Sequence, residues 1–144
     1  MPRLPLTSTL QKAEDLNDHS AAVLLVIVIL ELKHFFADYP FQSPWMVQNK
    51  GTWGHPAGIV HSLIHVVLTP IAFFVITPSL GVGIGILVGE FLLHYHIDVT
   101  KDALMRRRKL TVADSRFWLL LGLDQLAHHL TYVAIAAVLW KTAT

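Results

Sequence analysis

The sequence predicts an all-α polytopic membrane protein in which four transmembrane helices form an up-down bundle. Of its 144 residues, 53% are hydrophobic and only 15% are charged, and the mean hydropathy is +0.52. These values lie outside the range of ordinary soluble domains. Four apolar runs are long enough, or nearly so, to cross about 30 Å of hydrocarbon as helices of roughly 20 residues. They cover residues 20–39, 57–77, 80–97 and 117–140.

Composition also excludes several classes of protein. A net charge of +1, with the basic residues gathered in one loop, gives no support for nucleic-acid binding. Cysteine is absent, which rules out disulfides and thiolate zinc sites, so a metal would need His, Asp, Glu or backbone oxygen as ligands. A soluble helical bundle is the alternative fold, but none of the runs has the regular polar face of a surface helix.

The segments around the helices carry few signals. Residues 1–19 mix prolines and charges and are expected to form a solvated tail or a short surface helix, and residues 141–144 form a second tail. The first apolar run lacks a basic flank and a small-residue cleavage site, so we expect it to stay in the mature protein. Pro70 predicts a kink in the second helix. Gly81, Gly85 and Gly89 form a stripe expected to pack closely against a neighbouring helix.

Each predicted helix carries one ionisable pair spaced i, i+4, and residues at that spacing share one helix face. The pairs of the first and third helices lie at the C-terminal ends, whereas those of the second and fourth lie toward the N-terminal ends. In an up-down bundle these ends meet on one side of the membrane, so all the pairs should converge at similar depth. The pairs are His34/Asp38, His61/His65, His94/Asp98 and Asp124/His128.

Charge distribution predicts the orientation of this cluster. Lysine and arginine accumulate in cytoplasmic loops, and the two loops next to the cluster hold most of the basic residues. The cluster should therefore face the cytoplasm, with both termini outside it. The basic loop should also contact anionic lipid headgroups of the bilayer. Its headgroup candidates are Arg106, Arg107, Arg108 and Lys109.

A weak internal repeat is also present. The first and third helices both read His-aromatic-x-x-Asp, at His34 and His94. Each is followed by a helix whose pair lies near its start, which favours two repeated helical hairpins related by an axis along the membrane normal. The sequence also allows a homo-oligomer.

Several spaced motifs resemble a family of bacterial and phage membrane proteins, number 3307 in the domain-of-unknown-function series. The resemblance covers about residues 30–130. It implies the inner membrane of a bacterium as the location and brings no established activity. A looser likeness to inner-membrane proteins classed as metal-dependent hydrolases rests only on His and Asp pairs in a small helical membrane protein, and it is an analogy. The motifs of the family resemblance are His34-Phe-Phe-Ala-Asp38-Tyr-Pro-Phe-Gln42, Trp45-Met46 with Asn49-Lys50-Gly51, His61-x-x-x-His65, His94-x-x-Ile-Asp98-x-x-Lys101 and Asp124-Gln125-x-x-His128.

Imidazole and carboxylate groups in this number are suitable ligands for a divalent metal ion: zinc, iron or manganese. One helical turn at i, i+4 spacing can present two of them to the same ion. A bis-histidine haem site is disfavoured, because it would leave the aspartates unexplained. The expected ligands are His61, His65, His94, Asp98, Asp124 and His128, with His34 and Asp38 as further ligands or as residues that orient them.

The preferred function is metal-dependent hydrolysis of a lipid-linked or membrane-adjacent substrate. Glu31 or Glu90 would act as the base, whereas Lys33 falls off the polar face and is expected to extend to the interface. One alternative is transport of an ion, a metal or protons, and another is a structural or partner-binding protein whose polar pairs only lock helix packing. The candidate substrate-binding residues are Gln42, Asn49, Lys50 and Lys101.

Overall fold

The protein is all-helical throughout the part that the computed structural model describes, which is the backbone of residues 6–143 and the side chains of residues 17–142. Residues 1–5 and 144 of the predicted tails lie outside the described residues. The helices are α1 (Leu6–Asp38), α2 (Pro44–Asn49), α3 (Pro56–Leu68), α4 (Pro70–Phe73), α5 (Leu80–Arg107) and α6 (Ser115–Ala143).

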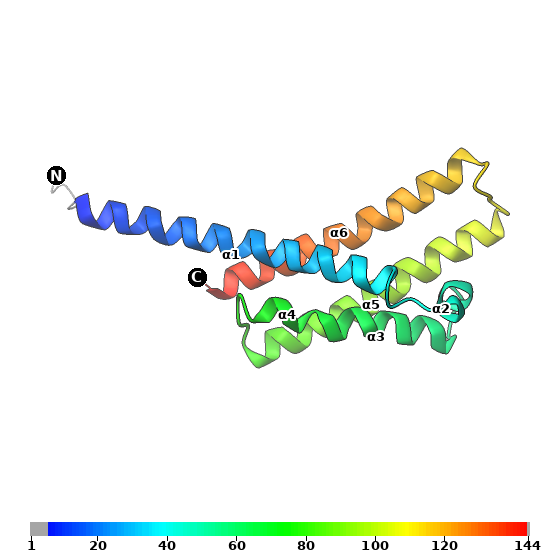
Figure 1. Ribbon diagram of the computed structural model, residues 1–144, viewed down its shortest axis with the longest axis horizontal. Coiled ribbons are helices and arrows are strands. Elements are labelled where there is room, and N and C mark those ends of the chain that lie inside the picture. Colours follow the sequence, from blue (N-terminus) through cyan, green and yellow to red (C-terminus); the bar gives the residue numbers. More distant parts are fainter. Residues whose placement is uncertain (1–5, 144) are drawn as a thin grey trace.

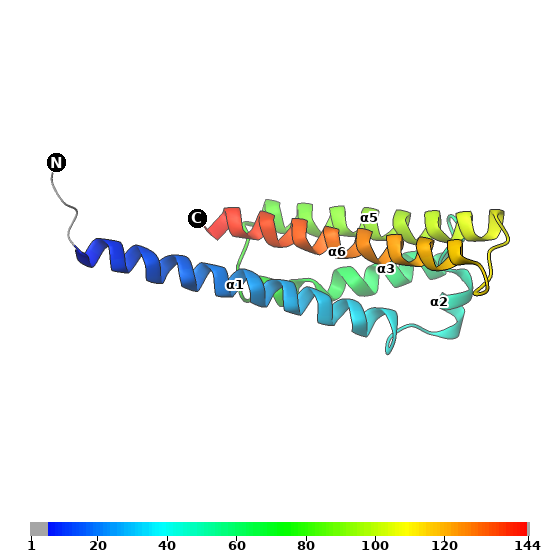
Figure 2. The same ribbon diagram turned by 90° about the horizontal axis from the view of Figure 1, so that it is seen from above.

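The long helices alternate in direction along the chain. The start of α1 and the end of α6 lie at one end of the molecule, and α2 and the α5–α6 connection lie at the other (Figure 1). Helix α1 packs against α3, α4 and α6, whereas α5 packs against α3 and α6. Figure 2 shows α5 and α6 side by side. Helices α1 and α5 therefore face each other across the diagonal of the assembly.

Helix boundaries differ from the apolar runs in an instructive way. Helix α1 already begins at Leu6, and α5 continues to Arg107 instead of ending near residue 97. The length of an apolar run shows how much hydrocarbon a helix can cross, but it does not set where the helix ends. The backbone hydrogen bonds of a helix can continue into the polar residues on either side of the run. The predicted second helix is broken at Thr69, because Pro70 has no N–H to donate, and its last turn ends at Phe73.

A short connection covers the end of the molecule opposite the termini. Helix α2 begins after Ser43, whose side chain accepts a hydrogen bond from the Met46 N–H at 3.3 Å. The following turn is tied to α5, because the Gly54 N–H donates to the Tyr95 hydroxyl at 2.6 Å and Arg106 donates to the Gly51 carbonyl. These contacts hold the α2 segment against the end of α5.

The loop before α6 is fixed locally. The Thr111 N–H and hydroxyl both donate to the Asp114 carboxylate, at 2.8 and 3.0 Å. These two bonds, the first of them with the backbone, hold the pKa of Asp114 below its usual value.

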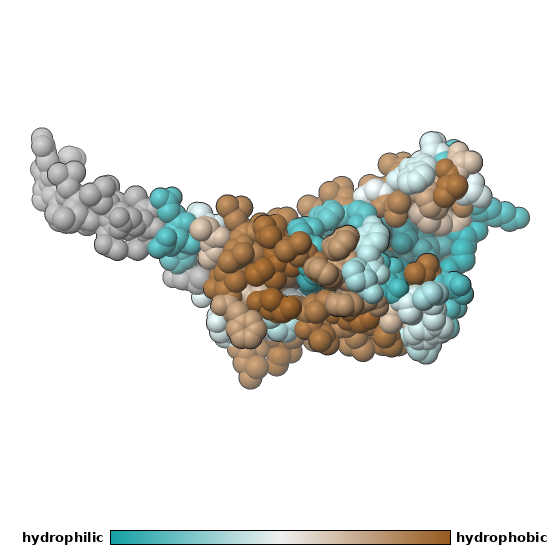
Figure 3. Space-filling view, in the orientation of Figure 1, coloured by the Kyte–Doolittle hydropathy of each residue, from teal (hydrophilic) through white to brown (hydrophobic). Residues whose placement is uncertain are grey.

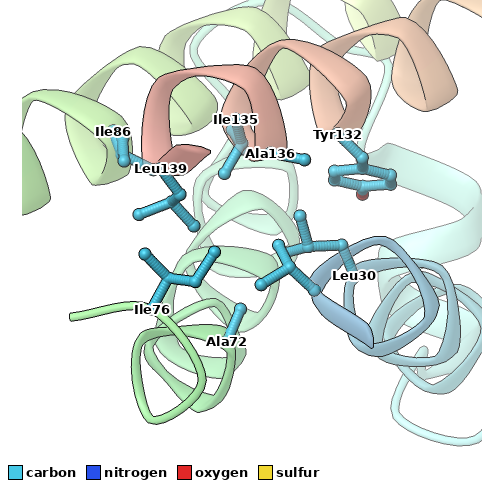
Figure 4. Close-up of a cluster of buried hydrophobic side chains, with 9 residues drawn as sticks. Leu30, Ala72, Ile76, Ile86, Tyr132, Ile135, Ala136 and Leu139 are labelled. Carbon is cyan, nitrogen blue, oxygen red and sulfur yellow. The ribbon is translucent and has the colours of Figure 1, made fainter. Parts of the chain in front are cut away.

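Buried side chains from α1, α4, α5 and α6, together with Ile76, form the apolar core, in the half of the molecule nearer the end of α6, and Figure 4 shows how they meet. Leu30 of α1, Ala72 of α4 and Leu139 of α6 meet there with no exposed surface. The remaining buried members of this core are Val26, Ile76, Ile86, Tyr132, Ile135 and Ala136.

Large apolar side chains also cover the outside of the helices, which is the reverse of a soluble protein. Phe74 is 90% exposed and Val67 is 72% exposed, and Figure 3 shows a broad hydrophobic surface on this face of the molecule. Within the described residues, three segments are long and apolar enough to cross a membrane: Asn17–Asp38, Pro56–Phe73 and Leu80–Arg107. Together these features indicate membrane association. Helix α6 is not among the three segments.

The glycine stripe of α5 does not pack as expected. A Cβ atom added at Gly81, Gly85 or Gly89 would meet nothing within 4 Å, so no helix of the described chain approaches this stripe closely. Gly83 is the buried glycine of α5, and a Cβ atom added there would lie 3.5 Å from Cγ of Pro78.

Candidate metal centre

The four ionisable pairs of the sequence converge in one buried cluster, in the half of the molecule opposite the apolar core. They come from α1, α3, α5 and α6, and His61 and His65 have no exposed surface. The bundle positions them as the i, i+4 spacing predicts, because each pair lies on the inward face of its helix. The other buried members are His34, His94, Asp98, Asp124 and His128, with Asp38 partly buried.

A first group of possible metal ligands combines three helices. Asp38 of α1, His61 and His65 of α3 and His94 of α5 each offer one ligand atom, and these atoms lie within 4.8 Å of one another. The Asp38 Oδ1 atom is 3.1 Å from His61 Nε2 and 3.4 Å from His65 Nε2. Three imidazoles and one carboxylate form a suitable donor set for a four-coordinate ion.

A second group shares His94 with the first. It consists of His94, Asp98 and His128, whose ligand atoms also lie within 4.8 Å of one another. The distance from His94 Nε2 to Asp98 Oδ2 is 3.7 Å, and His128 Nε2 is 3.7 Å from Asp98 Oδ1. The His65 and His94 rings are 3.7 Å apart between centroids, so the two groups are contiguous.

Several ligand atoms in this cluster are buried and form no hydrogen bond in the described structure, although ion-pair neighbours lie 3.1–3.7 Å from some of them. Buried polar atoms are nearly always hydrogen-bonded, so several such atoms facing a common space need an explanation. A bound cation would accept electron pairs from several of them at once. The buried atoms without a partner include Asp38 Oδ1, His65 Nε2, His94 Nε2, Asp98 Oδ2 and Asp124 Oδ1.

The sequence profile of a family described as a protein of unknown function, DUF3307, matches residues 24–144. The chain belongs to this family. No curated protein and no solved structure shows significant similarity to it. The matched part of the DUF3307 chain includes every residue of the two ligand groups.

Two further predicted ligands border the groups in the DUF3307 chain. Asp124 Oδ1 is 3.7 Å from His128 Nε2. His34 lies behind the first group, with its Nε2 atom 3.2 Å from Asp38 Oδ2 and 3.3 Å from Gln125 Oε1. Its position suits a residue that orients the Asp38 carboxylate.

Tyr132 is a member of the site that sequence reasoning missed. Its hydroxyl oxygen is 2.8 Å from His34 Nδ1 and 3.4 Å from His65 Nδ1. It therefore links two histidines through the ring nitrogens opposite those that face Asp38. The signal was present in the sequence, because Tyr132 follows His128 by four residues on the same face of α6.

Lys33 is the second surprise, and the expectation that it extends to the interface is wrong. Its ammonium is buried, forms an ion pair with Glu90 and donates to the His65 carbonyl at 3.1 Å. Glu90 also accepts a hydrogen bond from the Thr69 hydroxyl at 2.5 Å. Lysine is long enough to reach across the diagonal from α1 to α5, which helix-face reasoning does not capture.

The two glutamates considered as bases lie away from both ligand groups. Both carboxylate oxygens of Glu90 are engaged, one by Lys33 and one by Thr69. Glu31 lies on the outside of α1, where its Oε2 atom is 2.7 Å from His129 Nδ1 and its side chain is 36% exposed.

Two lysines border the cluster at its open end. Lys50 Nζ is 3.2 Å from Asp98 Oδ2 and 3.0 Å from His61 Nε2. Lys101 Nζ is 3.7 Å from Asp124 Oδ2. A cavity of about 340 Å³ opens beside them, and we refer to it as the end cavity. Its lining includes Asp38, Gln42, Lys50, Lys101, Asp102, Asp124 and Gln125.

The other substrate-binding candidates have different surroundings. The Gln42 side chain lines the end cavity and donates to the Asp38 carbonyl. Asn49 donates to the Trp45 carbonyl at 2.9 Å in an exposed position and is not part of the cavity lining. The structure thus brings Gln42, Lys50 and Lys101 to one opening and leaves Asn49 outside it.

Proposed function

We propose that this protein is a membrane metalloenzyme that hydrolyses a lipid-linked or membrane-adjacent substrate. The observation that carries the proposal is the set of buried, unpartnered ligand atoms in the two overlapping groups. A buried polar atom that forms no hydrogen bond typically costs about 1–3 kcal/mol. Coordination of a cation removes that cost and also balances the negative charge of the aspartates.

The proposed cofactor is one divalent ion in each group, or a single ion shared between them. Nitrogen and oxygen donors without sulfur suit zinc, iron or manganese. Asp38, His61, His65 and His94 would hold the first ion, and His94, Asp98 and His128 the second. A bound ion of this kind lowers the pKa of water and polarises a carbonyl or phosphoryl group.

The residues around the cluster would complete the hydrolytic site. We assign the base to Asp124 in place of Glu31 and Glu90, because Asp124 lines the end cavity, borders the second group and has a buried oxygen without a partner. Lys50 and Lys101 would neutralise an anionic group of the substrate. Gln42 would donate or accept a hydrogen bond at the same opening.

The proposed setting is the inner membrane of a bacterium, with four transmembrane helices and both termini outside the cytoplasm. Support for the fourth crossing comes from α6, which packs along α1 and α5. Its outward side chains are apolar, and Leu119, Leu126 and Leu130 are 62%, 51% and 57% exposed. Two polar residues that lower its hydropathy, Asp124 and His128, face the cluster, where other helices cover them. Support for orientation comes from the basic loop after α5.

A transport function has one supporting observation. The ion pair of Lys33 and Glu90 extends the polar groups about one helical turn deeper than His94. Beyond it, the described buried core is apolar and includes Leu30, Ile86 and Leu139, so a route would have to cross this layer. A purely structural role would leave these ligand atoms balanced only by the ion pairs that Lys50 and the histidines form with Asp38 and Asp98.

Elemental analysis tests the proposal directly. Protein purified in detergent without chelator should carry about one or two equivalents of metal. His65→Ala and Asp98→Ala should each lose at least the metal bound by the ligand group to which the substituted residue belongs. His96→Ala is the matched control, because His96 is an exposed histidine two residues from His94 on the same helix. Parent protein without stoichiometric metal would overturn the proposal. Hydrolysis is then tested on panels of phospholipids and acylated lipids. If the protein binds metal but hydrolyses none of them, the metal centre has a structural or transport role.

A further inference from the structure

A second opening reaches the cluster from the side of the molecule, between α5 and α6. A cavity of about 360 Å³ there is lined by apolar side chains from both helices, and we refer to it as the side groove. Lys101 and Asp124 belong to its lining and also to the lining of the end cavity. The apolar lining consists of Leu93, Ile97, Leu104, Leu120, Leu123 and Ala127.

We propose that the side groove binds the acyl chain of a phosphate-headed membrane lipid, with the phosphate at Lys101. The proposal rests on the proposed function, because it makes this lipid the substrate that reaches the metal centre from the bilayer. The groove opens on the outward surface of the helices, where Leu93 and Leu123 are 52% and 51% exposed. An acyl chain in the surrounding hydrocarbon could enter it sideways without crossing water.

Lys101 provides the charge that favours an anionic head. Its side chain is 14% exposed, and its ammonium is 3.5–3.9 Å from three carboxylates. These distances are longer than those of strong charge-assisted hydrogen bonds, so donors remain for a phosphate oxygen. Each of these carboxylates also has a second basic neighbour, so the three carboxylates do not fully neutralise the charge of Lys101. The neighbouring pairs are Asp98 with Lys50, Asp102 with Arg106 and Asp124 with His128.

The two cavities together match an amphiphile better than a free phosphate. A small water-soluble phosphate would use only the end cavity and would gain nothing from the leucines of the side groove. A lipid would place its chain against Leu120 and Leu123 and its phosphate at the point where the linings coincide. Its ester or phosphoester bond would then lie beside Asp124, the residue to which we assign the base.

Photochemical labelling in lipid nanodiscs tests this site. The protein is placed in phosphatidylcholine nanodiscs containing a minor fraction of phosphatidic acid with a diazirine in its acyl chain. Labelled residues are then identified by mass spectrometry. The chain offers two matched pairs of variants: Leu93→Trp against Leu92→Trp, and Leu123→Trp against Leu126→Trp. In each pair only the first residue lines the groove, and the members are almost equally exposed, at 52% and 50% and at 51% and 51%.

Label should concentrate on the groove residues and fall about tenfold in Leu93→Trp and Leu123→Trp, because the indole displaces about two methylenes of chain. The two control variants should label like the parent. Excess unlabelled phosphatidic acid should compete, whereas inorganic phosphate and phosphatidylcholine should not. Equal labelling of all four variants, or no preference for phosphatidic acid, would show ordinary surrounding lipid and would overturn the proposal.

Metal content measured on the same samples separates the two proposals. If the protein contains metal but shows no selective labelling, the proposed lipid site is wrong and the proposed metal centre is still supported. If labelling is selective but the protein contains no metal, the lipid site is supported and the proposed metal-dependent hydrolysis is wrong.

Discussion

The Lys33 ammonium and the Glu90 carboxylate form an ion pair across the diagonal between α1 and α5, with side chains only 2% and 1% exposed. The pair lies next to the first group of candidate ligands, because Lys33 also donates to the carbonyl of His65. A buried charge that loses its partner is expensive, whereas removing both charges together costs little. This contact therefore joins two helices that face each other across the diagonal and that approach again only through side chains of the cluster, such as His34 and His94.

Removing one member of this pair should destabilise the protein. We expect Lys33→Met to lower the free energy of unfolding by about 3 kcal/mol, because Glu90 would remain buried and charged. The double variant Lys33→Met with Glu90→Leu should recover most of that loss. Denaturation in mixed detergent micelles, followed by circular dichroism, provides the measurement. A double variant no more stable than the single one would show that the pair is not the source of the effect.

Because both ligand groups contain His94, substitutions should have unequal effects on metal content. His94→Ala should lose metal from both groups, whereas His128→Ala should lose it only from the second. Elemental analysis after equilibration with zinc, at matched protein concentration, distinguishes these outcomes. Equal loss in the two variants would mean that the groups bind a single shared ion.

Tyr132→Phe should weaken metal binding without unfolding the protein. The hydroxyl contacts ring nitrogens of His34 and His65, and loss of such an orienting contact typically costs 10–100-fold in metal affinity. Competition with a fluorescent zinc chelator measures the change. Tyr39→Phe is the control, since Tyr39 is 69% exposed and its substitution should leave the affinity unchanged.

The sequence predicted the composition of the cluster because helical periodicity is a local property. The i, i+4 pairs of α3 and α5 point inward as expected, and alternating helix direction brings their ends together. Periodicity does not describe contacts across the diagonal, so Lys33 was assigned to the interface although it is buried. Periodicity also does not show whether Glu90 is free to act as a base, because that depends on its partners in three dimensions. The role of Tyr132 was missed because the pattern of pairs was built from histidine and carboxylate residues, and tyrosine is not one of them.

The α2 segment should respond to a single methyl group on α3. A Cβ at Gly58 would lie 2.6 Å from the Lys50 carbonyl oxygen and 3.1 Å from the Tyr95 ring. Gly58→Ala should therefore push Lys50 away from the cluster and destabilise the protein by about 1–3 kcal/mol. Gly85→Ala on α5 is the matched control, because its Cβ would meet nothing within 4 Å, and higher helix propensity should leave stability unchanged or raised. Thermal unfolding in detergent compares the two.

Orientation in the membrane can be tested independently of metal. Fusion of a reporter that is active only in the cytoplasm, inserted in the loop that follows Arg108, should give full activity. The same reporter fused after Thr144 should be inactive if both termini lie outside. The opposite pattern of activity would place the cluster on the other side of the membrane.

The order of the ligands along the chain has a consequence for biosynthesis. Asp38, the two histidines of α3 and His94 all precede α6 in the chain. If the helices insert in order, as the proposed topology requires, the first group is complete before α6 has been translated. Asp98 then has no partner from α6 until His128 is inserted. A chain truncated before that point keeps an aspartate in the bilayer with one fewer compensating group, which is costly in hydrocarbon. Premature termination in this gene should therefore produce fragments that membrane proteases recognise by their uncompensated charge.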